Sequence, residues 1–249
     1  MRFKLLCVLI AAAVMGVPSL ARAEATPFDL AIIAKARAYV GPEATLNSIR
    51  TIHFTGHLTT DDGAKAALDI MFKKPCCQRV VTTGDKQIEV TALDDYDAWQ
   101  RISDAKDLRH KTLAILGKDK ILRLRANTFE NLYFFRGVTD PEDIDDLGRT
   151  TIDGREAVKL RFNYDPGIYF VRYFDVETGK LLRTETAFGD VIVEEGRIVV
   201  DGVKFAKRII TTSPKPGGGT YRMTVDFDKV TLNEEMPESL FSVPLPTFD

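Results

Sequence analysis

Cysteine is scarce in this chain of 249 residues, which contains only three. Disulfide-built scaffolds need many spaced cysteines, so that class of protein is excluded. Cys7 lies in an apolar N-terminal stretch, while Cys76 and Cys77 are neighbours. Adjacent residues on a strand point to opposite faces, so a bond between these two would be strained. We expect two structural thiols, with a strained redox pair or an intermolecular bond as the alternatives.

Histidine is equally rare, with three residues, and no common catalytic motif is present. The sequence lacks a serine nucleophile elbow, a His-Glu-x-x-His helix and a glycine-rich phosphate loop. His53 and His57 are four apart on one predicted strand, roughly 13 Å, which is too far for both to bind one metal. Acidic pairs lie at predicted turns, where solvated carboxylates are the default: Asp61-Asp62, Asp94-Asp95 and Asp145-Asp146. We therefore expect the protein not to be an enzyme and to need neither a metal nor a cofactor.

Positive charge is not in excess either, since the formal net charge is −2. Residues 1–23 hold three basic and no acidic residues, so the remaining 31 basic and 36 acidic residues give −5. This balance argues against a nucleic-acid partner. No segment after residue 23 is apolar enough to cross a membrane.

The N-terminus has the three-part layout of a secretory signal peptide. Two basic residues precede an almost wholly apolar stretch, Leu5 to Val17, and Ala21-Arg22-Ala23 offers small residues at a cleavage site. The apolar core of about thirteen residues is shorter than the ~20 needed to span a bilayer, although an uncleaved anchor helix is the alternative. We expect residues 1–23 to be removed, leaving residues 24–249 as a single domain in a bacterial periplasm.

Two segments have helical spacing of apolar residues. Residues 28–40 form the first, and Gly41-Pro42 stops it. A short connecting segment follows at residues 44–49. The second region, residues 104–136, interrupts a series of strands and carries apolar residues three or four apart together with one threonine: Ile121, Leu124, Thr128, Leu132 and Phe135.

Most of the remaining chain alternates with the period of a strand. In residues 51–59, Ile52, Phe54 and Leu58 share one side, and threonines and histidines take the other. Asp61-Asp62-Gly63 is a turn signal that joins this strand to a second at residues 66–72. Further strands are predicted near residues 78–83, 87–93, 158–162, 168–174, 181–187, 191–195, 203–212 and 221–232, about ten in all.

A sheet of this size with one apolar face must cover that face, and the helices are the only available cover. The predicted fold class is α+β, mainly β. We expect a strongly curved antiparallel sheet that forms an open half-barrel, covered by helices around an apolar cavity. Periodicity alone does not separate such a cavity from an ordinary packed core, so both interpretations stay open at this point.

Four local motifs, in order along the chain, resemble the periplasmic lipoprotein carrier LolA and the wider outer-membrane lipoprotein-sorting superfamily. They are Lys73-Lys74-Pro75 at the end of a strand, the acidic turn from Leu93 to Trp99, the hairpin from Tyr173 to Lys180, and Phe241-Ser242-Val243-Pro244 near the end of the chain. The resemblance implies an open β-barrel with a helical lid over an apolar cavity. It also implies that the cavity accepts the acyl chains of lipoproteins.

On this resemblance, the apolar sides of the strands are expected to line the cavity. The expected lining residues are Phe54, Leu58, Leu68, Ile70, Phe72, Val90, Trp99, Leu160, Phe162, Phe170 and Phe174, and the expected lid or closure residues are Lys74, Leu124, Leu132 and Phe135. The chain departs from the family at Lys74, where classical carriers have an arginine that helps to close the lid. An ammonium lacks the planar fork of a guanidinium, which puts closure by that route in doubt.

The resemblance predicts a monomeric periplasmic carrier that moves lipoprotein acyl chains, or another lipid, between membranes. Membrane-bound donor and acceptor proteins are the expected partners. The alternative function is a periplasmic module that senses or binds lipid or lipoprotein and regulates a partner protein without transport.

Overall fold

The computed structural model describes residues 27–138 and 140–244. The predicted signal peptide, residues 1–23, lies outside the described residues. Three helices are present in the described part: α1 (Pro27–Val40), α2 (Glu43–Ser48) and α3 (Lys118–Leu132). None of the described helices combines the length and apolar character that crossing a membrane requires.

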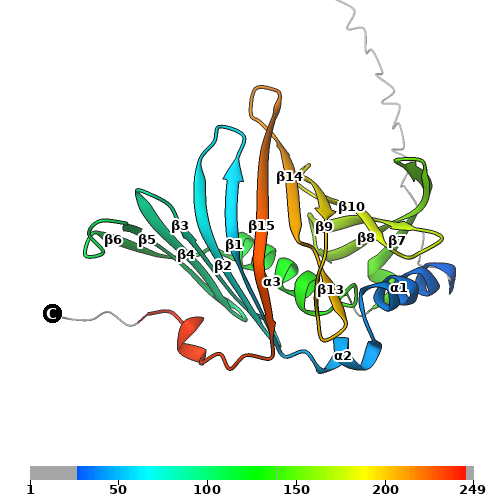
Figure 1. The fold of residues 1–249 in the computed structure, drawn as a ribbon, viewed down its shortest axis with the longest axis horizontal. Helices are drawn as coiled ribbons and strands as arrows, with labels where there is room; N and C mark the ends of the chain where they lie inside the picture. Colours follow the sequence, from blue (N-terminus) through cyan, green and yellow to red (C-terminus); the bar gives the residue numbers. More distant parts are fainter. Residues whose placement is uncertain (1–26, 139, 245–249) are drawn as a thin grey trace, which may run out of the picture.

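One large antiparallel sheet dominates the described chain and does not close into a barrel (Figure 1). Its strand order is β6-β5-β4-β3-β2-β1-β15-β14-β11-β10-β9-β8-β7. The strands are β1 (Thr51–Thr60), β2 (Lys65–Lys73), β3 (Cys77–Thr83), β4 (Gln87–Asp94), β5 (Asp97–Asp104), β6 (Lys111–Ile115), β7 (Ile144–Ile152), β8 (Arg155–Asp165), β9 (Ile168–Asp175), β10 (Leu181–Thr186), β11 (Val191–Glu195), β14 (Arg208–Pro214) and β15 (Thr220–Leu232). A separate two-stranded sheet pairs β12 (Ile198–Val200) with β13 (Val203–Phe205).

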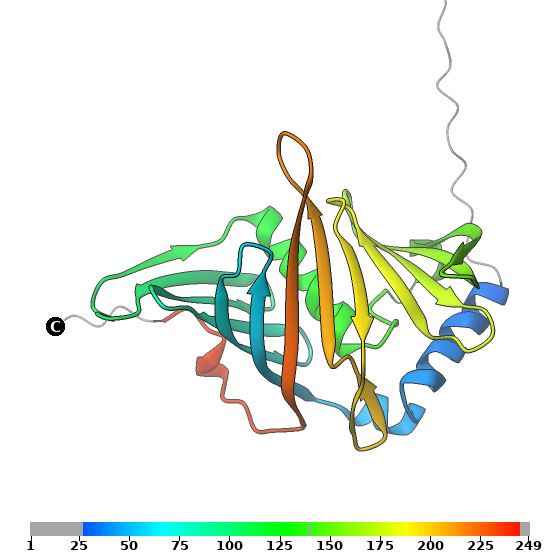
Figure 2. The same ribbon diagram turned by 45° about the horizontal axis from the view of Figure 1, so that its top comes forward.

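The sheet curves around α3, which lies on its concave side and packs on β2, β3, β4 and β9 (Figures 1 and 2). We call α3 the lid helix. Helix α1 covers the other end of the same face, where it packs on β8. The predicted α+β half-barrel covered by helices is therefore confirmed.

Strand register decides which side chains face the lid helix. Phe54 on β1 pairs with Ile70 on β2, which pairs with Val80 on β3, so these three side chains share the concave face. Across the sheet, Arg172 on β9 pairs with Thr184 on β10 on that same face. At Gly56 the pairing of β1 with β15 shifts by one residue, and an added Cβ there would come within 2.2 Å of the Asp226 carbonyl oxygen. Glycine is required at this close approach of two backbones.

Helices fill both flanks of the concave face. Under α1, a cluster contains buried Val158, Leu160, Phe162 and Phe174. Under the first half of the lid helix, a second cluster contains Leu93, Ala98 and Leu116 and is contacted by Ile121 and Leu124. The middle of the face is left between these two packed regions.

The C-terminal segment covers part of the convex face. Phe241 is almost fully buried, and its carbonyl oxygen accepts a hydrogen bond from Trp99 Nε1 at 2.7 Å. Ser242 Oγ donates to Asp94 Oδ2 at 3.0 Å. Two of the motifs that carried the family resemblance, the acidic turn and the Phe-to-Pro tail, therefore meet in space.

Several elements differ from the sequence expectations. Residues 104–136 are helical only from Lys118, because they begin with a loop and the edge strand β6. The side chains of β6 are all exposed, so this strand has no alternation of buried and exposed residues to predict it. Strands β5, β7 and β12 were not predicted. The expected strand 203–212 is divided into β13 and β14, which belong to different sheets.

Candidate ligand cavity

A cavity of about 390 Å³ lies between the lid helix and the middle of the concave face. Its size is within the range of roughly 300–1,000 Å³ that is typical of small-molecule sites. Aromatic and aliphatic side chains form most of its wall: Val40, Phe54, Ile70, Phe72, Val80, Phe134, Phe135, Phe170, Leu181, Ile192, Phe205, Ala206, Ile209, Met223, Val225 and Phe227. An apolar wall of this kind favours an apolar guest.

Four of the residues that the sequence placed in the cavity do line it: Phe54, Ile70, Phe72 and Phe170. Phe54 is the centre of the aromatic wall. Its ring centroid lies 6.3 Å from that of Phe72, 5.6 Å from that of Phe205 and 4.8 Å from that of Phe227. Whether these residues bind a ligand stays a prediction.

Five other expected lining residues share the concave face without lining the cavity. Leu58 and Leu68 belong to the packed cluster around β1 and β2. Leu160, Phe162 and Phe174 are fully buried beneath α1. The expected place of these last three is corrected, because α1 fills the space above them. Strand periodicity carries no information on where a helix packs.

Val90 and Trp99 lie on the opposite, convex face, which corrects their expected place as well. They pack with Ala92, and the C-terminal segment contacts the Trp99 indole. Both residues were expected to face the helices because they lie on apolar sides of their strands. Here β4 and β5 have apolar residues on both faces, because the convex face is also covered.

Two of the expected lid residues, Leu124 and Leu132, belong to the lid helix, and the other two lie in or near the segment that follows it. Leu124 packs in the cluster under the first half of the helix, and Leu132 is fully buried at its end. Phe135, just after the helix, lines the cavity and packs edge-on against Phe174 at 5.1 Å. Lys74 Nζ lies 5.1 Å from the centre of the Tyr133 ring. Burial lowers the pKa of Lys74, as do the nearby charges of Arg50 and Arg37.

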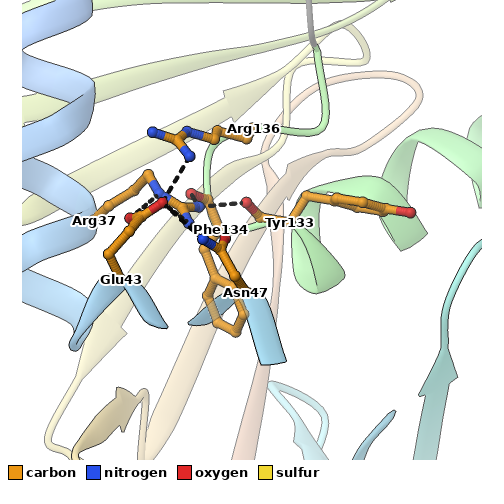
Figure 3. Close-up of polar contacts among 6 residues, drawn as sticks. All are labelled: Arg37, Glu43, Asn47, Tyr133, Phe134 and Arg136. Carbon is orange, nitrogen blue, oxygen red and sulfur yellow. Dashed lines mark hydrogen bonds and ion pairs between the residues drawn. The ribbon is translucent and has the colours of Figure 1, made fainter. Parts of the chain in front are cut away.

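A guanidinium does hold the end of the lid helix, but it belongs to Arg37 of α1 (Figure 3). Arg37 Nη1 donates to the carbonyl oxygens of Tyr133 and Phe134, both at 2.8 Å. Arg37 Nε and Nη2 donate to the two carboxylate oxygens of Glu43 at 2.9 and 3.0 Å. Arg37 is only 2% exposed. Its buried guanidinium therefore supplies hydrogen-bond donors to carbonyl groups at the C-terminal end of the helix.

The middle of the lid helix is attached to the acidic turn between β4 and β5. Arg125 Nη1 donates to the Asp95 carbonyl oxygen at 2.9 Å and also pairs with the Asp95 carboxylate. Tyr133 OH, just beyond the C-terminal end of the helix, donates to the Pro75 carbonyl oxygen at 3.0 Å. Polar contacts therefore attach the lid helix at its middle and just beyond its C-terminal end, in addition to its apolar packing on the sheet.

One buried ion pair interrupts the apolar wall. Arg172 on β9 and Glu130 on the lid helix line the cavity, and Arg172 Nη2 pairs with Glu130 Oε2. Tyr164 OH donates to the other oxygen of Glu130. Glu194 on β11 lines the cavity as well, and burial raises the pKa of its carboxyl group against the opposing charges of Arg197, Arg172 and Lys180.

Arg37, Glu130 and Arg172 were not among the residues predicted from the sequence. A signal for Arg172 was present, because this charged residue sits between Phe170 and Phe174 on the apolar side of a predicted strand. Such a position predicts a buried charge that needs a partner. No comparable signal marked Arg37, because the two carbonyl groups that it contacts at the end of the lid helix lie 96 and 97 residues away along the chain.

Cys76 and Cys77 are both free and buried in the structure. Cys76 lies in the turn before β3 and Cys77 is the first residue of that strand, and the two pack in different clusters, Cys76 with Leu93 and Cys77 with Met236. Burial raises the pKa of Cys76 to about 12 and that of Cys77 to about 11. These values fit structural thiols.

Neither the scan of family models nor the search of curated proteins matched this sequence. Solved structures do match its fold. A LolA superfamily protein from Nitrosomonas europaea has a TM-score of 0.54 at 13% identity, over 86% of this chain and 97% of its own. A DUF1329 family protein from Desulfovibrio piger has the same TM-score at 9% identity, over 86% of this chain and 96% of its own.

The fold is LolA-like. The predicted resemblance is confirmed at this level, over most of the described chain. The LolA-like sheet and the lid helix together position the cavity, and the comparisons do not extend to a ligand.

Proposed function

We propose that this protein binds the acyl chains of lipoproteins, or of another lipid, in the cavity and carries them through the periplasm between membranes. The observation that carries this proposal is the cavity of about 390 Å³ with a mostly apolar wall beneath the lid helix. The LolA-like fold supports it, as does the signal-peptide pattern of the N-terminus.

The energetics of an acyl chain require such a shelter. Each buried CH₂ group is worth about 0.8 kcal/mol, so a long chain has on the order of 10 kcal/mol keeping it out of water. A soluble carrier must offer a comparable apolar surface and then release the chain. A helix that borders a cavity has fewer packing partners to lose than a fully packed core element, so it can move away from the sheet at a lower cost.

Two neighbouring residues of β11 give a matched test. Ile192 lines the cavity, whereas Val193 points outward and is 36% exposed. Ile192→Glu places a carboxylate in the apolar wall, and we expect it to weaken binding of an uncharged fluorescent fatty-alcohol probe roughly tenfold or more, because burying an unpaired charge is costly. Val193→Glu adds the same charge to the outer surface and should leave binding unchanged.

Circular dichroism and thermal unfolding establish that both variants are folded. The proposal fails if the wild-type protein binds no acyl probe, or if the Ile192 and Val193 variants bind the probe as well as the wild type does.

A further inference from the structure

Arg172 is an unusual residue for an apolar cavity. It is 6% exposed, and its guanidinium carbon lies 4.8 Å from the centre of the Phe135 ring and 5.3 Å from that of Phe162. The ion pair with Glu130 uses one terminal nitrogen, Nη2. The guanidinium is thus held between aromatic rings, at the wall of the cavity.

Two nitrogen atoms of this guanidinium, Nε and Nη1, have no hydrogen-bond acceptor among the described residues. Neighbouring polar groups of the cavity do have hydrogen-bond partners. Gln78 Oε1 accepts from Asn127 and Thr128 at 3.1 and 3.0 Å, and Asn131 Nδ2 donates to the Asn127 carbonyl oxygen at 2.8 Å. Buried donors without an acceptor are rare in native proteins, because each one carries the full cost of its desolvation.

The charges around the cavity restrict what kind of acceptor fits. Burial lowers the pKa of Arg172 to about 9, while Glu194 acts to raise it, so the guanidinium is charged at neutral pH. Glu130 already balances this charge through the ion pair. Burial raises the pKa of Glu194, and the ammonium of Lys204 is directed to the Tyr39 carbonyl oxygen at 2.7 Å. Because Glu130 balances the guanidinium of Arg172, that guanidinium offers free N–H donors without an unbalanced positive charge for an added anion.

We propose that Arg172 donates a hydrogen bond to an uncharged acyl carbonyl oxygen, so that the cavity prefers esterified or amidated acyl chains over free fatty acids and fatty amines. This inference rests on the proposed function and adds a specificity-determining residue to it. The tail of the ligand occupies the apolar wall, and its carbonyl oxygen lies beside Nε and Nη1 of Arg172. A ligand carboxylate would be repelled by the Glu130 carboxylate, and a ligand ammonium would be repelled by the guanidinium.

Four competitors with the same tail separate head-group recognition from tail binding. They are methyl laurate, lauric acid, laurylamine and dodecane, each used to displace a fluorescent fatty-alcohol probe at neutral pH. We expect methyl laurate to bind about tenfold more tightly than dodecane, the usual gain from a hydrogen bond to a charged donor. Lauric acid and laurylamine should both bind more weakly than the ester.

Removing Arg172 alone would leave the Glu130 carboxylate buried without its partner and could unfold the protein. The test variant is therefore the double substitution Arg172→Met with Glu130→Gln, in which the glutamine can still accept from Tyr164. The control is Arg183→Met with Glu185→Gln, which removes another arginine–glutamate pair, from strand β10 and away from the cavity lining. We expect the Arg172 variant alone to lose the preference for the ester while still binding dodecane.

A spectroscopic measurement reads the hydrogen bond directly. Methyl laurate labelled with ¹³C at its carbonyl carbon should show a lower carbonyl stretching frequency in the wild-type protein than in the Arg172 variant. This readout does not depend on the overall stability of either protein.

The outcomes distinguish this inference from the proposed function. If dodecane and the ester bind equally in the wild type, or if lauric acid binds most tightly, the role assigned to Arg172 is wrong while acyl binding stands. An unshifted carbonyl frequency would overturn it as well. If none of the four compounds displaces the probe and the probe itself does not bind, the proposed function fails and the inference fails with it.

Discussion

At the residue scale, some phenylalanines of the concave face are packed on all sides and others border the cavity. Phe174 is fully buried beneath α1 and contacts the rings of Phe135 and Phe162. Phe72 is buried too, but part of its ring borders the cavity. Both residues are phenylalanines, so a difference in the cost of truncating them would show that Phe72 borders a cavity.

We expect Phe174→Ala to lower the free energy of unfolding by about 3–5 kcal/mol, the usual cost of truncating a packed phenylalanine. Phe72→Ala should cost clearly less, because some of its atoms have no packing partner to lose. It should also weaken binding of an acyl probe. Urea unfolding and probe titration of the two variants provide the comparison. Equal losses of stability, with no probe bound by the wild type, would mean that the sheet encloses an ordinary core.

A second prediction at this scale concerns the two buried thiols. The thiolate is the reactive form of cysteine, and burial raises the pKa of Cys76 to about 12 and that of Cys77 to about 11. Both thiols should therefore be almost wholly protonated at neutral pH. Ellman's reagent should not react with the folded protein over minutes and should react with both thiols once the protein is unfolded. Fast reaction of the folded protein would contradict this assignment.

Protonation of His53 should stabilise the folded protein, so this contribution to stability should decrease as the pH rises. Burial alone would lower the pKa of His53, but hydrogen bonds to Glu234 and Asp69, at 2.9 and 3.1 Å, outweigh it and raise the pKa above the usual 6.5. The protonated form is favoured by folding, so its contribution is fully present below pH 6.5 and is lost as the pH rises through the folded-state pKa. We expect His53→Gln to remove this component of the pH dependence in thermal unfolding between pH 5 and 8. An unchanged pH profile in the variant would count against it.

Single residues also mark the limit of the sequence argument. Phe54, Ile70, Phe72 and Phe170 were placed on the cavity wall from strand alternation and the family resemblance. Leu160 and Phe162 have the same alternation, yet α1 covers them. Alternation assigns a side chain to a face, and only tertiary packing decides whether that part of the face is filled.

At the scale of elements, the lid helix depends on one arginine from another helix. Arg37 contacts the Tyr133 and Phe134 carbonyl oxygens, and Arg136 reaches Glu43 from the outer side at 2.7 Å (Figure 3). The Arg37 side chain is 3% exposed and that of Arg136 is 55% exposed. The inner arginine should therefore matter far more than the outer one.

We expect Arg37→Met to lower the free energy of unfolding by about 1–3 kcal/mol, because buried carbonyl groups lose their donors. Amide hydrogen exchange in α3 should become faster than in the wild type, and the acyl probe should exchange more quickly. Arg136→Met is the matched control and should change stability by less than about 0.5 kcal/mol, as exposed pairs usually do. Unchanged hydrogen exchange in α3 of the Arg37 variant would show that this arginine does not restrain the lid helix.

Elements were predictable where their pattern is local. The helix at residues 28–40 and the strand at residues 191–195 follow directly from spacing and flanking turn residues, and the structure has them within one residue. The hairpin from Tyr173 to Lys180 is equally local, since Asp175 Oδ1 accepts from the backbone and hydroxyl of Thr178, both at 2.7 Å. Strand β6 has no such pattern, because it is an exposed edge paired on one side only.

At the scale of the whole molecule, one curved sheet is covered by two helices at different places, and the cavity lies where neither fills the concave face. The pattern of the sequence predicted the curved sheet and its helical cover, because a long series of strands with one apolar side needs helices to cover that side. The volume and position of the cavity could not be predicted, because they depend on how far α1 and α3 each extend across the sheet.

The final prediction separates transport from sensing. Donor vesicles carrying a fluorescent acyl lipid are mixed with acceptor vesicles, and transfer is followed with and without the protein. A carrier with one lipid site should speed transfer in proportion to its concentration, because each protein molecule moves one lipid molecule at a time. Ile192→Glu should abolish the effect and Val193→Glu should retain it, since only the first alters the cavity wall. If the wild type binds the probe tightly and yet leaves the transfer rate unchanged, transport is the wrong conclusion, and the cavity then serves a protein that holds lipid in order to regulate a partner.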